Sequence, residues 1–136
     1  MKRIMFVCKN NSARSQMAEA FAKQLGAGQV AVTSSGLEAS QVNPGAIAAM
    51  DEIGIDIRHQ TSKALADFRP EDFDVVISLC GCGVNLPDAW LLREVFADWQ
   101  LDDPAEHPEL FSQVRDEIQR RVQTLLAQIT ASDPGR

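Results

Sequence analysis

Apolar residues follow two different spacings along the chain. Short runs rich in β-branched and aromatic side chains predict four strands. These runs are residues 4–7, 29–36, 73–79 and 94–99. Elsewhere apolar residues recur every three or four positions, which predicts helices. The helical segments are residues 14–25, 44–53, 63–68 and 108–131.

The ends of these helices carry the residues that helix ends prefer. Asn43 precedes Pro44, so we expect Asn43 to cap the second helix and Pro44 to occupy its first turn. Gly26 and Gly28 follow the last apolar residue of the first helix and predict its end.

Strands that alternate with helices predict an α/β fold, in which right-handed crossovers join parallel strands and helices cover both faces of the sheet. Residues 1–131 form a single domain in this interpretation, and residues 132–136 form a frayed tail. With four parallel strands in the order 2-1-3-4, the first and third strands are neighbours at the switch point, where open α/β sheets bind ligands.

Composition and charge exclude several classes of partner. The net charge of −6 means that nucleic acid and anionic membranes are not expected partners. No apolar stretch has transmembrane length and no signal-peptide pattern is present, which predicts a cytoplasmic protein. Three cysteines, an odd number in a chain without a secretion signal, favour reactive thiols over a structural disulfide framework.

The main chemical signal lies between the first strand and the first helix. Cys8 ends the strand, a polar loop follows, and Arg14 with Ser15 opens the helix. Amides of such a loop bind anions, and the Arg14 guanidinium matches two oxygens of a tetrahedral oxyanion. The same positive potential favours the nucleophilic thiolate of Cys8, and the Ser15 hydroxyl can donate to its sulfur. The predicted anion ligands are Lys9, Asn10, Asn11, Ser12, Ala13 and Arg14.

Asn10 and Asn11 also tolerate left-handed backbone conformations and can brace the loop from within. The alternative is a structural cysteine buried beside an ordinary helix start. That alternative accounts for fewer of the residues in the loop.

Two further thiols follow the third predicted strand. Cys80 and Cys82 alternate with glycines, which predicts a mobile segment. Adjacent strands lie about 4.8 Å apart, and a disulfide needs Cα atoms about 5.5–6 Å apart. Cys8 and Cys80 are therefore within bonding reach after a small loop movement if their strands are neighbours. One thiol suffices for phosphoester hydrolysis, whereas a two-electron reduction needs a second, and a third can pass the oxidation outward.

The three thiols favour arsenate over phosphate as the reacting anion. Arsenate has nearly the same shape and charge as phosphate, but its arsenic(V) accepts two electrons from thiols, whereas phosphate cannot be reduced in this way. Half a zinc site is the competing interpretation of Cys80 and Cys82. No second Cys/His pair completes it, since His59 and His107 stand alone in predicted surface loops. We therefore predict no metal site.

A candidate acid follows the last predicted strand. Asp103 directly precedes Pro104, which favours an extended conformation for Asp103. In a phosphatase-like reaction it would protonate the leaving group, with Asp102 as the fallback. An ordinary turn aspartate explains an Asp-Pro pair equally well.

Together the motifs resemble the low-molecular-weight tyrosine phosphatase fold and, more narrowly, the arsenate reductases built on it. The resemblance covers nearly the whole chain. It rests on segments 8–20, 34–36, 42–44, 59–62, 77–80, 99, 102–105 and 114–118. It implies a four-stranded parallel sheet of order 2-1-3-4, Cys8 as nucleophile, Arg14 as oxyanion ligand and relay thiols downstream.

Three departures from the family pattern bear on function. Thioredoxin-recycled reductases place the third cysteine several residues beyond the second, whereas Cys82 is two residues beyond Cys80. This spacing resembles a smaller group recycled by glutathione and glutaredoxin, so we expect that route, with thioredoxin second. Asn10 and Ala13 replace a glycine and a second cysteine that are common in phosphatase loops, and Ala13 removes a thiol that could trap Cys8.

The remaining departure is Lys63, which stands where family members with a potassium site have an aspartate. Asn11, Glu19 and Ser34 match the other side-chain ligands of that site. We hypothesise that the Lys63 ammonium replaces potassium, pairs with Glu19 and braces the anion loop. An ordinary solvated lysine is equally compatible with the sequence.

The sequence thus predicts an arsenate reductase without a bound cofactor, for which phosphate and sulfate are competing anions. Cys8 attacks arsenic, and Cys80 and Cys82 pass the oxidation to glutathione and glutaredoxin. One alternative is a tyrosine or small-ester phosphatase, although the chain has no tyrosine to wall the substrate cleft. The other is a redox- or anion-sensing domain that signals through its C-terminal helix.

Overall fold

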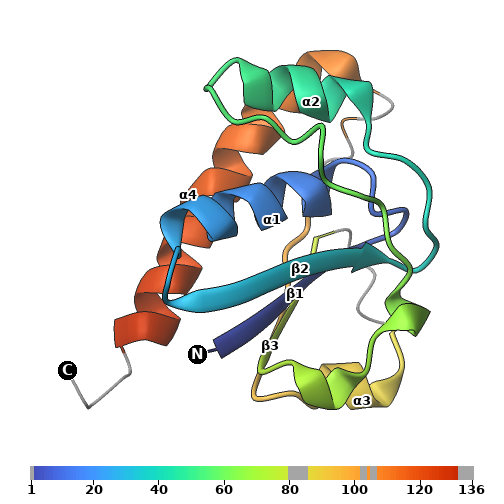
Figure 1. Ribbon diagram of the computed structural model, residues 1–136, viewed down its shortest axis with the longest axis vertical. Coiled ribbons are helices and arrows are strands. Elements are labelled where there is room, and N and C mark those ends of the chain that lie inside the picture. The colour runs from blue at the N-terminus through green and yellow to red at the C-terminus, as the bar shows by residue number, and fades with distance from the viewer. Residues whose placement is uncertain (1, 80–85, 102–103, 105–106, 132–136) are drawn as a thin grey trace.

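The computed structural model describes residues 2–79, 86–101, 104 and 107–131, and Figure 1 shows their arrangement. Strands and α-helices alternate along the chain, with short 3-10 turns (η) between some of them. In chain order the elements are β1 (Lys2–Cys8), α1 (Arg14–Leu25), β2 (Val30–Gly36), α2 (Pro44–Asp51), η1 (Leu65–Asp67), η2 (Pro70–Asp72), β3 (Val75–Ser78), α3 (Asp88–Leu91), β4 (Val95–Asp98), η4 (Pro108–Leu110) and α4 (Phe111–Ala131).

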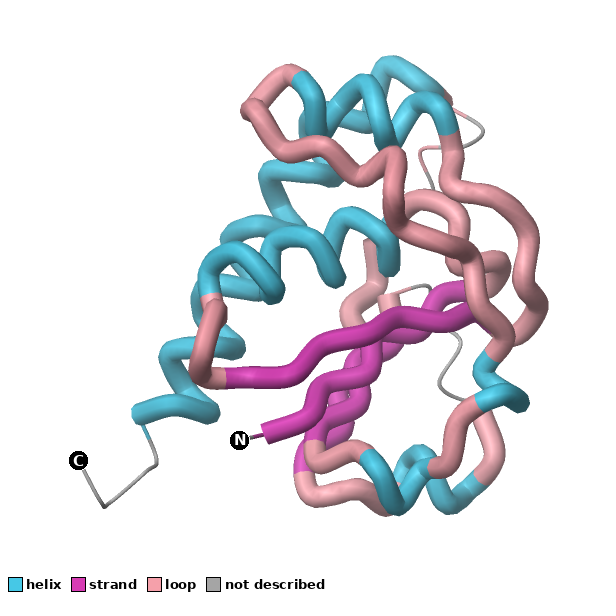
Figure 2. The backbone as a smooth tube through the Cα atoms, viewed as in Figure 1, coloured by secondary structure: helices cyan, strands magenta, loops and turns pink. Residues whose placement is uncertain are grey.

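Four parallel strands form one sheet in the order β2-β1-β3-β4, which confirms the predicted topology (Figure 2). β1 lies between β2 and β3, with Cys8 opposite Gly36 and Val7 opposite Ser78. The carboxyl ends of the four strands lie at the same edge of the sheet. The loop after Cys8 begins at this edge between β1 and β3, which is the switch point where open α/β sheets bind ligands. The register therefore carries Cys8 to the ligand-binding edge of the sheet.

The central strand separates two hydrophobic clusters. Ile4 and Phe6 point to one face, where they pack in a cluster with residues of α1, α2 and α4. Met5 and Val7 point to the other face and pack with α3 and the turn η1. All four side chains are fully buried, as a strand with a side-chain period of two requires when both faces are covered. Helices on both faces were predicted, and the structure has them.

Helix α2 begins as its sequence predicts. The Asn43 side chain accepts a hydrogen bond from the Gly45 backbone N–H at 2.7 Å, and Pro44 occupies the first turn. The predicted helix at 63–68 is instead a three-residue turn, η1, and the long C-terminal helix starts at Phe111 after the turn η4. The prediction of a helix at 63–68 was wrong, because a six-residue segment is too short for its apolar spacing to distinguish a helix from a turn. The later start of the C-terminal helix is a shift at the end of an element, where the hydrophobic spacing carries the least information.

The sequence pattern missed α3. This helix has four residues, which is too short for a helical spacing of apolar residues to show. Trp90 holds it in place, since its ring is buried and lies 5.7 Å, centroid to centroid, from the ring of Phe73. Among the described residues, no helix has the length and apolar character that a bilayer-spanning helix needs. The predicted tail, 132–136, lies outside the described residues.

Candidate active site

The loop between β1 and α1 presents hydrogen-bond donors rather than acceptors. Each carbonyl oxygen of residues 8–13 accepts a hydrogen bond from a group beyond the loop. In loop order the donors are Leu37 N, Glu38 N, the Ser40 and Ser62 hydroxyls, the Gln16 carboxamide, Asn43 N and Met17 N. In the described part of the chain, no acceptor contacts the N–H groups of residues 9–13. Paired carbonyls and unpaired amides make an anion-binding nest.

Cys8 ends β1 directly before this nest. Its side chain is buried, with 3% of the residue exposed, and its sulfur lies 2.8 Å from the Ser15 hydroxyl oxygen. Ser15 occupies the first turn of α1, so the strand and the helix bring the two groups together from opposite ends of the loop. The sulfur thus has a hydroxyl neighbour and a row of unpaired amides beside it.

Asn11 determines which way the Ser15 hydroxyl points. The Lys63 backbone N–H can only donate and lies 2.7 Å from the Asn11 carboxamide oxygen, which fixes the orientation of that amide. The Asn11 nitrogen therefore donates to the Ser15 and Ser34 hydroxyls, at 2.8 and 2.9 Å. Among the described residues the Ser15 hydroxyl hydrogen has no acceptor other than the Cys8 sulfur, so it can donate there. A hydroxyl that donates to a sulfur stabilises the thiolate form. Asn11 has φ = 48°, a left-handed conformation of the kind predicted for it.

Glu19 anchors the far end of this hydrogen-bond chain. Its carboxylate is buried, with 2% of the residue exposed, and accepts a hydrogen bond from the Ser34 hydroxyl. Lys23 Nζ lies 2.6 Å and Lys63 Nζ 3.6 Å from its oxygens, and Lys63 Nζ also donates to the Thr61 carbonyl at 2.6 Å. Lys23 was not predicted as a site residue, although its spacing of four from Glu19 on a helix is a signal that could have found it.

Gln16 ties the nest to the segment before η1, and the sequence interpretation gave it no role. Its buried carboxamide nitrogen donates to the Asn11 main-chain oxygen at 3.1 Å, the Asn11 side-chain oxygen at 3.0 Å and the Thr61 carbonyl at 2.9 Å. Its own side-chain oxygen accepts from the Gln60 carboxamide at 2.7 Å. Gln16 is a buried and Gln60 a half-buried polar residue, and hydrophobic spacing does not detect such positions.

Arg14 connects the nest to the other strands at this edge of the sheet. Its Nη1 donates to the Leu79 carbonyl at 3.2 Å and to the Leu101 carbonyl at 3.0 Å, and the residue is 8% exposed. The Leu79 N–H in turn donates to the Val7 carbonyl at 2.8 Å. Up to residue 79, the chain that follows β3 therefore runs beside β1 next to Cys8.

Three predicted site residues, Cys80, Cys82 and Asp103, lie outside the described residues, as does the fallback acid Asp102. Their roles stay predictions. Among the described residues Cys8 is a free cysteine. Of the predicted site residues, Cys8, Asn11, Ser15, Glu19, Ser34 and Lys63 lie in one connected hydrogen-bond network. The anion-binding roles of residues 9–14 stay predictions.

Gly36 lets the nest approach the end of β2. A Cβ atom at this position would lie 2.5 Å from the Asn11 backbone nitrogen and 2.7 Å from the Asn10 carbonyl carbon, where no side chain fits. The sequence predicted Gly36 only as the turn glycine at the end of a strand, because a close approach between segments far apart in sequence leaves no local signal.

Comparison with known proteins agrees with this geometry. The sequence model of the family described as low molecular weight phosphotyrosine protein phosphatase matches residues 3–134. The chain belongs to this family. The resemblance inferred from the sequence is thereby confirmed.

Relatives of this family member include named arsenate reductases. It is 60% identical over 131 residues, 96% of this chain and 100% of the other, to the glutaredoxin arsenate reductase of Synechocystis sp.. It is 45% identical over 120 residues, 86% of this chain and 90% of the other, to the arsenate reductase of Staphylococcus aureus strain Newman. A solved structure described as an arsenate reductase in the phosphate binding state is 60% identical, with a TM-score of 0.89 over 95% of this chain and 99% of that one.

Proposed function

We propose that this protein reduces arsenate to arsenite and that glutathione and glutaredoxin recycle it. The observation that carries the proposal is the 60% identity, over nearly the full length of both chains, to a protein named glutaredoxin arsenate reductase. The nest of unpaired amides beside Cys8 supports it, because such a nest suits a tetrahedral oxyanion.

In the first step arsenate occupies the nest and the Cys8 thiolate attacks arsenic(V). A hydroxide leaves arsenic and departs as water, with Asp103 as the proposed proton donor. The Ser15 hydroxyl lies 2.8 Å from the attacking sulfur and can donate to it, and the amides of residues 9–13 balance the charge of the oxyanion. Phosphate and sulfate compete for the same amides.

In the second step the Cys80 thiolate attacks the Cys8 sulfur. The bonding electron pair of the As–S bond stays on arsenic, which leaves as arsenite, and a Cys8–Cys80 disulfide forms. Cys82 then attacks Cys80, which frees Cys8 and leaves a Cys80–Cys82 disulfide. Two thiols of the glutathione and glutaredoxin system reduce this disulfide and complete the cycle. The pairing of Leu79 with Val7 favours this relay, since it brings the described chain beside Cys8 one residue before Cys80.

A coupled assay tests the proposal directly. NADPH consumption is followed with arsenate, glutathione, glutaredoxin and glutathione reductase, and a parallel reaction contains thioredoxin and its reductase instead. We expect turnover with glutaredoxin to exceed turnover with thioredoxin, and Cys8→Ser to abolish both. Cys80→Ser and Cys82→Ser should stop repeated turnover. Normal arsenate reduction by the double variant Cys80→Ser/Cys82→Ser would contradict the relay.

Phosphatase activity is the second candidate function, because the family carries the name of a phosphatase. The amide nest does not distinguish sharply between phosphate and arsenate oxygens, so we expect slow hydrolysis of an aryl phosphate. Hydrolysis faster than arsenate reduction would favour the phosphatase over the reductase. Loss of both activities in Cys8→Ser would show that they share one nucleophile.

We further propose that Lys63 takes the place of a potassium ion beneath the nest. Its ammonium contacts Glu19 and the Thr61 carbonyl, and its own N–H holds Asn11, so one residue supplies both a charge and a hydrogen bond. Lys23 pairs with the same carboxylate from the helix surface, where its side chain is 52% exposed.

The thermal unfolding midpoint in KCl and in choline chloride of equal ionic strength measures this role. We expect equal midpoints for the native chain and a potassium-dependent rise in Lys63→Ala. Lys23→Ala is the matched control, because it removes a cation from Glu19 while Lys63 stays in place. A strong potassium dependence of the native chain would contradict the proposal.

A further inference from the structure

The carbonyl oxygens of the nest differ in what holds them. Those of residues 8, 9, 12 and 13 accept from main-chain N–H groups, which almost any residue at the donor position would supply. The Asn10 oxygen accepts from two separate hydroxyls. For the Asn11 oxygen, the donor found in the described part of the chain is the Gln16 side chain alone, at 3.1 Å. One side chain therefore controls the direction of this carbonyl.

Asn11 is also the residue whose conformation shapes the nest. Its φ of 48° is left-handed, and no other non-glycine residue in the described ranges has a positive φ. Successive amides converge on an anion where right-handed and left-handed conformations follow one another. A left-handed backbone is strained for a residue other than glycine, so the contacts around it have to hold it in place.

Gln16 holds Asn11 at two oxygens. Its carboxamide nitrogen lies 3.1 Å from the main-chain oxygen and 3.0 Å from the side-chain oxygen of Asn11. The same nitrogen donates to the Thr61 carbonyl at 2.9 Å, so both of its hydrogens are used. Because main-chain oxygens can only accept, the nitrogen and the oxygen of this carboxamide cannot exchange places.

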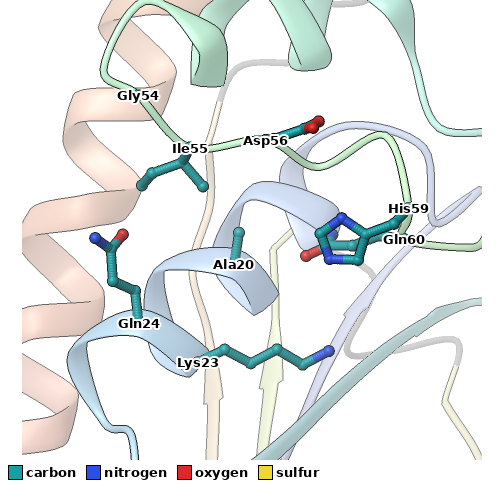
Figure 3. Close-up of a pocket in the computed structure, with 8 residues that line it drawn as sticks. All are labelled: Ala20, Lys23, Gln24, Gly54, Ile55, Asp56, His59 and Gln60. Atoms are coloured by element: carbon teal, nitrogen blue, oxygen red, sulfur yellow. The ribbon is translucent and has the colours of Figure 1, made fainter.

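Gln60 holds the other end of the Gln16 side chain. Its carboxamide donates to the Gln16 main-chain oxygen at 3.1 Å and to the Gln16 side-chain oxygen at 2.7 Å. Gln60 lies on one wall of a pocket of about 370 Å³ beside α1 (Figure 3), whereas Gln16 is fully buried. Every polar group of the Gln16 side chain is thus paired, and the side chain has one fixed orientation.

We infer that Gln16 is a positioning residue for oxyanion binding. Its hydrogen bonds keep Asn11 left-handed, and this conformation directs the amides of residues 9–13 at one point. Gln16 acts through Asn11 and needs no contact with the anion. The inference rests on the part of the proposed function in which the nest binds an oxyanion, but not on the reduction of arsenate.

Calorimetric titration with sulfate tests this role. Sulfate is a tetrahedral oxyanion that stays a dianion over the working pH range, so its own charge does not change. Gln16→Met keeps the length of the side chain but removes both donors, and we expect the dissociation constant for sulfate to rise about fivefold or more. Native affinity in this variant would overturn the inference but leave the nest as an oxyanion site. No sulfate binding by the native chain would overturn both.

Gln24→Met is the matched control. Gln24 is exposed and lies on the same helix, at the opposite end from Gln60 (Figure 3). The same substitution there should leave the dissociation constant for sulfate unchanged. An equal loss of affinity in both variants would trace the effect to the helix as a whole and would contradict a specific role for Gln16.

Alkylation of Cys8 by iodoacetamide without sulfate separates the amides from the thiol. In Gln16→Met it should slow by a smaller factor than the sulfate affinity falls, because the Lys63 N–H still holds the Asn11 side-chain oxygen at 2.7 Å. Equal factors would mean that Gln16 acts on the thiol rather than on the amides, and the inference would be wrong.

Gln16→Glu separates hydrogen bonding from packing. The introduced carboxyl has the size of the carboxamide but faces buried carbonyl oxygens, so its pKa should be raised. It donates one hydrogen bond when protonated and none when ionised. We expect its sulfate dissociation constant, relative to the native chain at the same pH, to fall about threefold or more from about pH 8 to about pH 5. A ratio that does not change with pH would show that Gln16 acts through its volume alone, which would overturn the inference.

Discussion

The side-chain amide of Asn11 links the Lys63 backbone N–H to the Ser15 hydroxyl, which contacts the Cys8 sulfur. The Lys63 N–H fixes its oxygen, so its nitrogen must face Ser15 and Ser34, and the Ser15 hydrogen is left for the Cys8 sulfur. The sequence could predict the residues of the loop, because Cys, Asn, Arg and Ser each have a local chemical reason to be there. It could not predict the direction of each hydrogen bond, since that depends on Lys63, 52 positions away.

The Ser15 hydroxyl should therefore govern the reactivity of Cys8. Ser15→Ala removes the donor at the sulfur, and a hydrogen bond to a charged group contributes about 1.5–3 kcal/mol. We expect Cys8 alkylation by iodoacetamide near neutral pH to slow about tenfold or more. Asn11 would then lose one acceptor but keep Ser34, so the fold should persist. An unchanged alkylation rate with an intact fold would show that Ser15 does not stabilise the thiolate.

At the scale of elements, the hydrophobic spacing was sufficient for the four strands and for α1, α2 and α4. It failed for α3, which has four residues and is held by the packing of Trp90 against Phe73. The hydrophobic spacing also did not predict the close approach of the end of β2 to the nest at Gly36. Both features depend on contacts between segments that are distant in the chain.

Gly36→Ala tests whether β2 sets the position of the nest. The added Cβ would lie 2.5 Å from the Asn11 backbone nitrogen, so the loop must move. Overpacking of this kind costs about 1–3 kcal/mol of unfolding free energy, and we also expect slower alkylation of Cys8. Both quantities are measurable, by urea unfolding and by mass spectrometry.

Gly28→Ala is the matched control for this substitution. Gly28 has φ = 80° and its Cβ would meet no atom within 4 Å, so alanine there costs backbone strain of about 1–2 kcal/mol without touching the nest. Its Cys8 alkylation rate should equal that of the native chain. Equal alkylation rates in the two alanine variants would mean that β2 does not position the nest.

At the scale of the whole molecule, the parallel sheet brings the carboxyl ends of β1, β2 and β3 to one edge. There Arg14, at the start of α1, donates to the Leu79 carbonyl after β3 and to the Leu101 carbonyl after β4. The alternation of strands and helices predicted this arrangement, and right-handed crossovers left few other topologies. The net charge of −6 makes the chain as a whole unattractive to anions. We therefore expect anion binding to depend on the unpaired amides of the nest, which the overall composition does not reveal.

If the proposed function is right, Cys8 starts an electron path from protein thiols to arsenic. Reduced protein is mixed with one equivalent of arsenate in the absence of any other reductant, and arsenite and free thiols are counted after the reaction. We expect one arsenite and the loss of two thiols for each chain, and neither change in Cys8→Ser. Three free thiols and no arsenite from the native chain would contradict it.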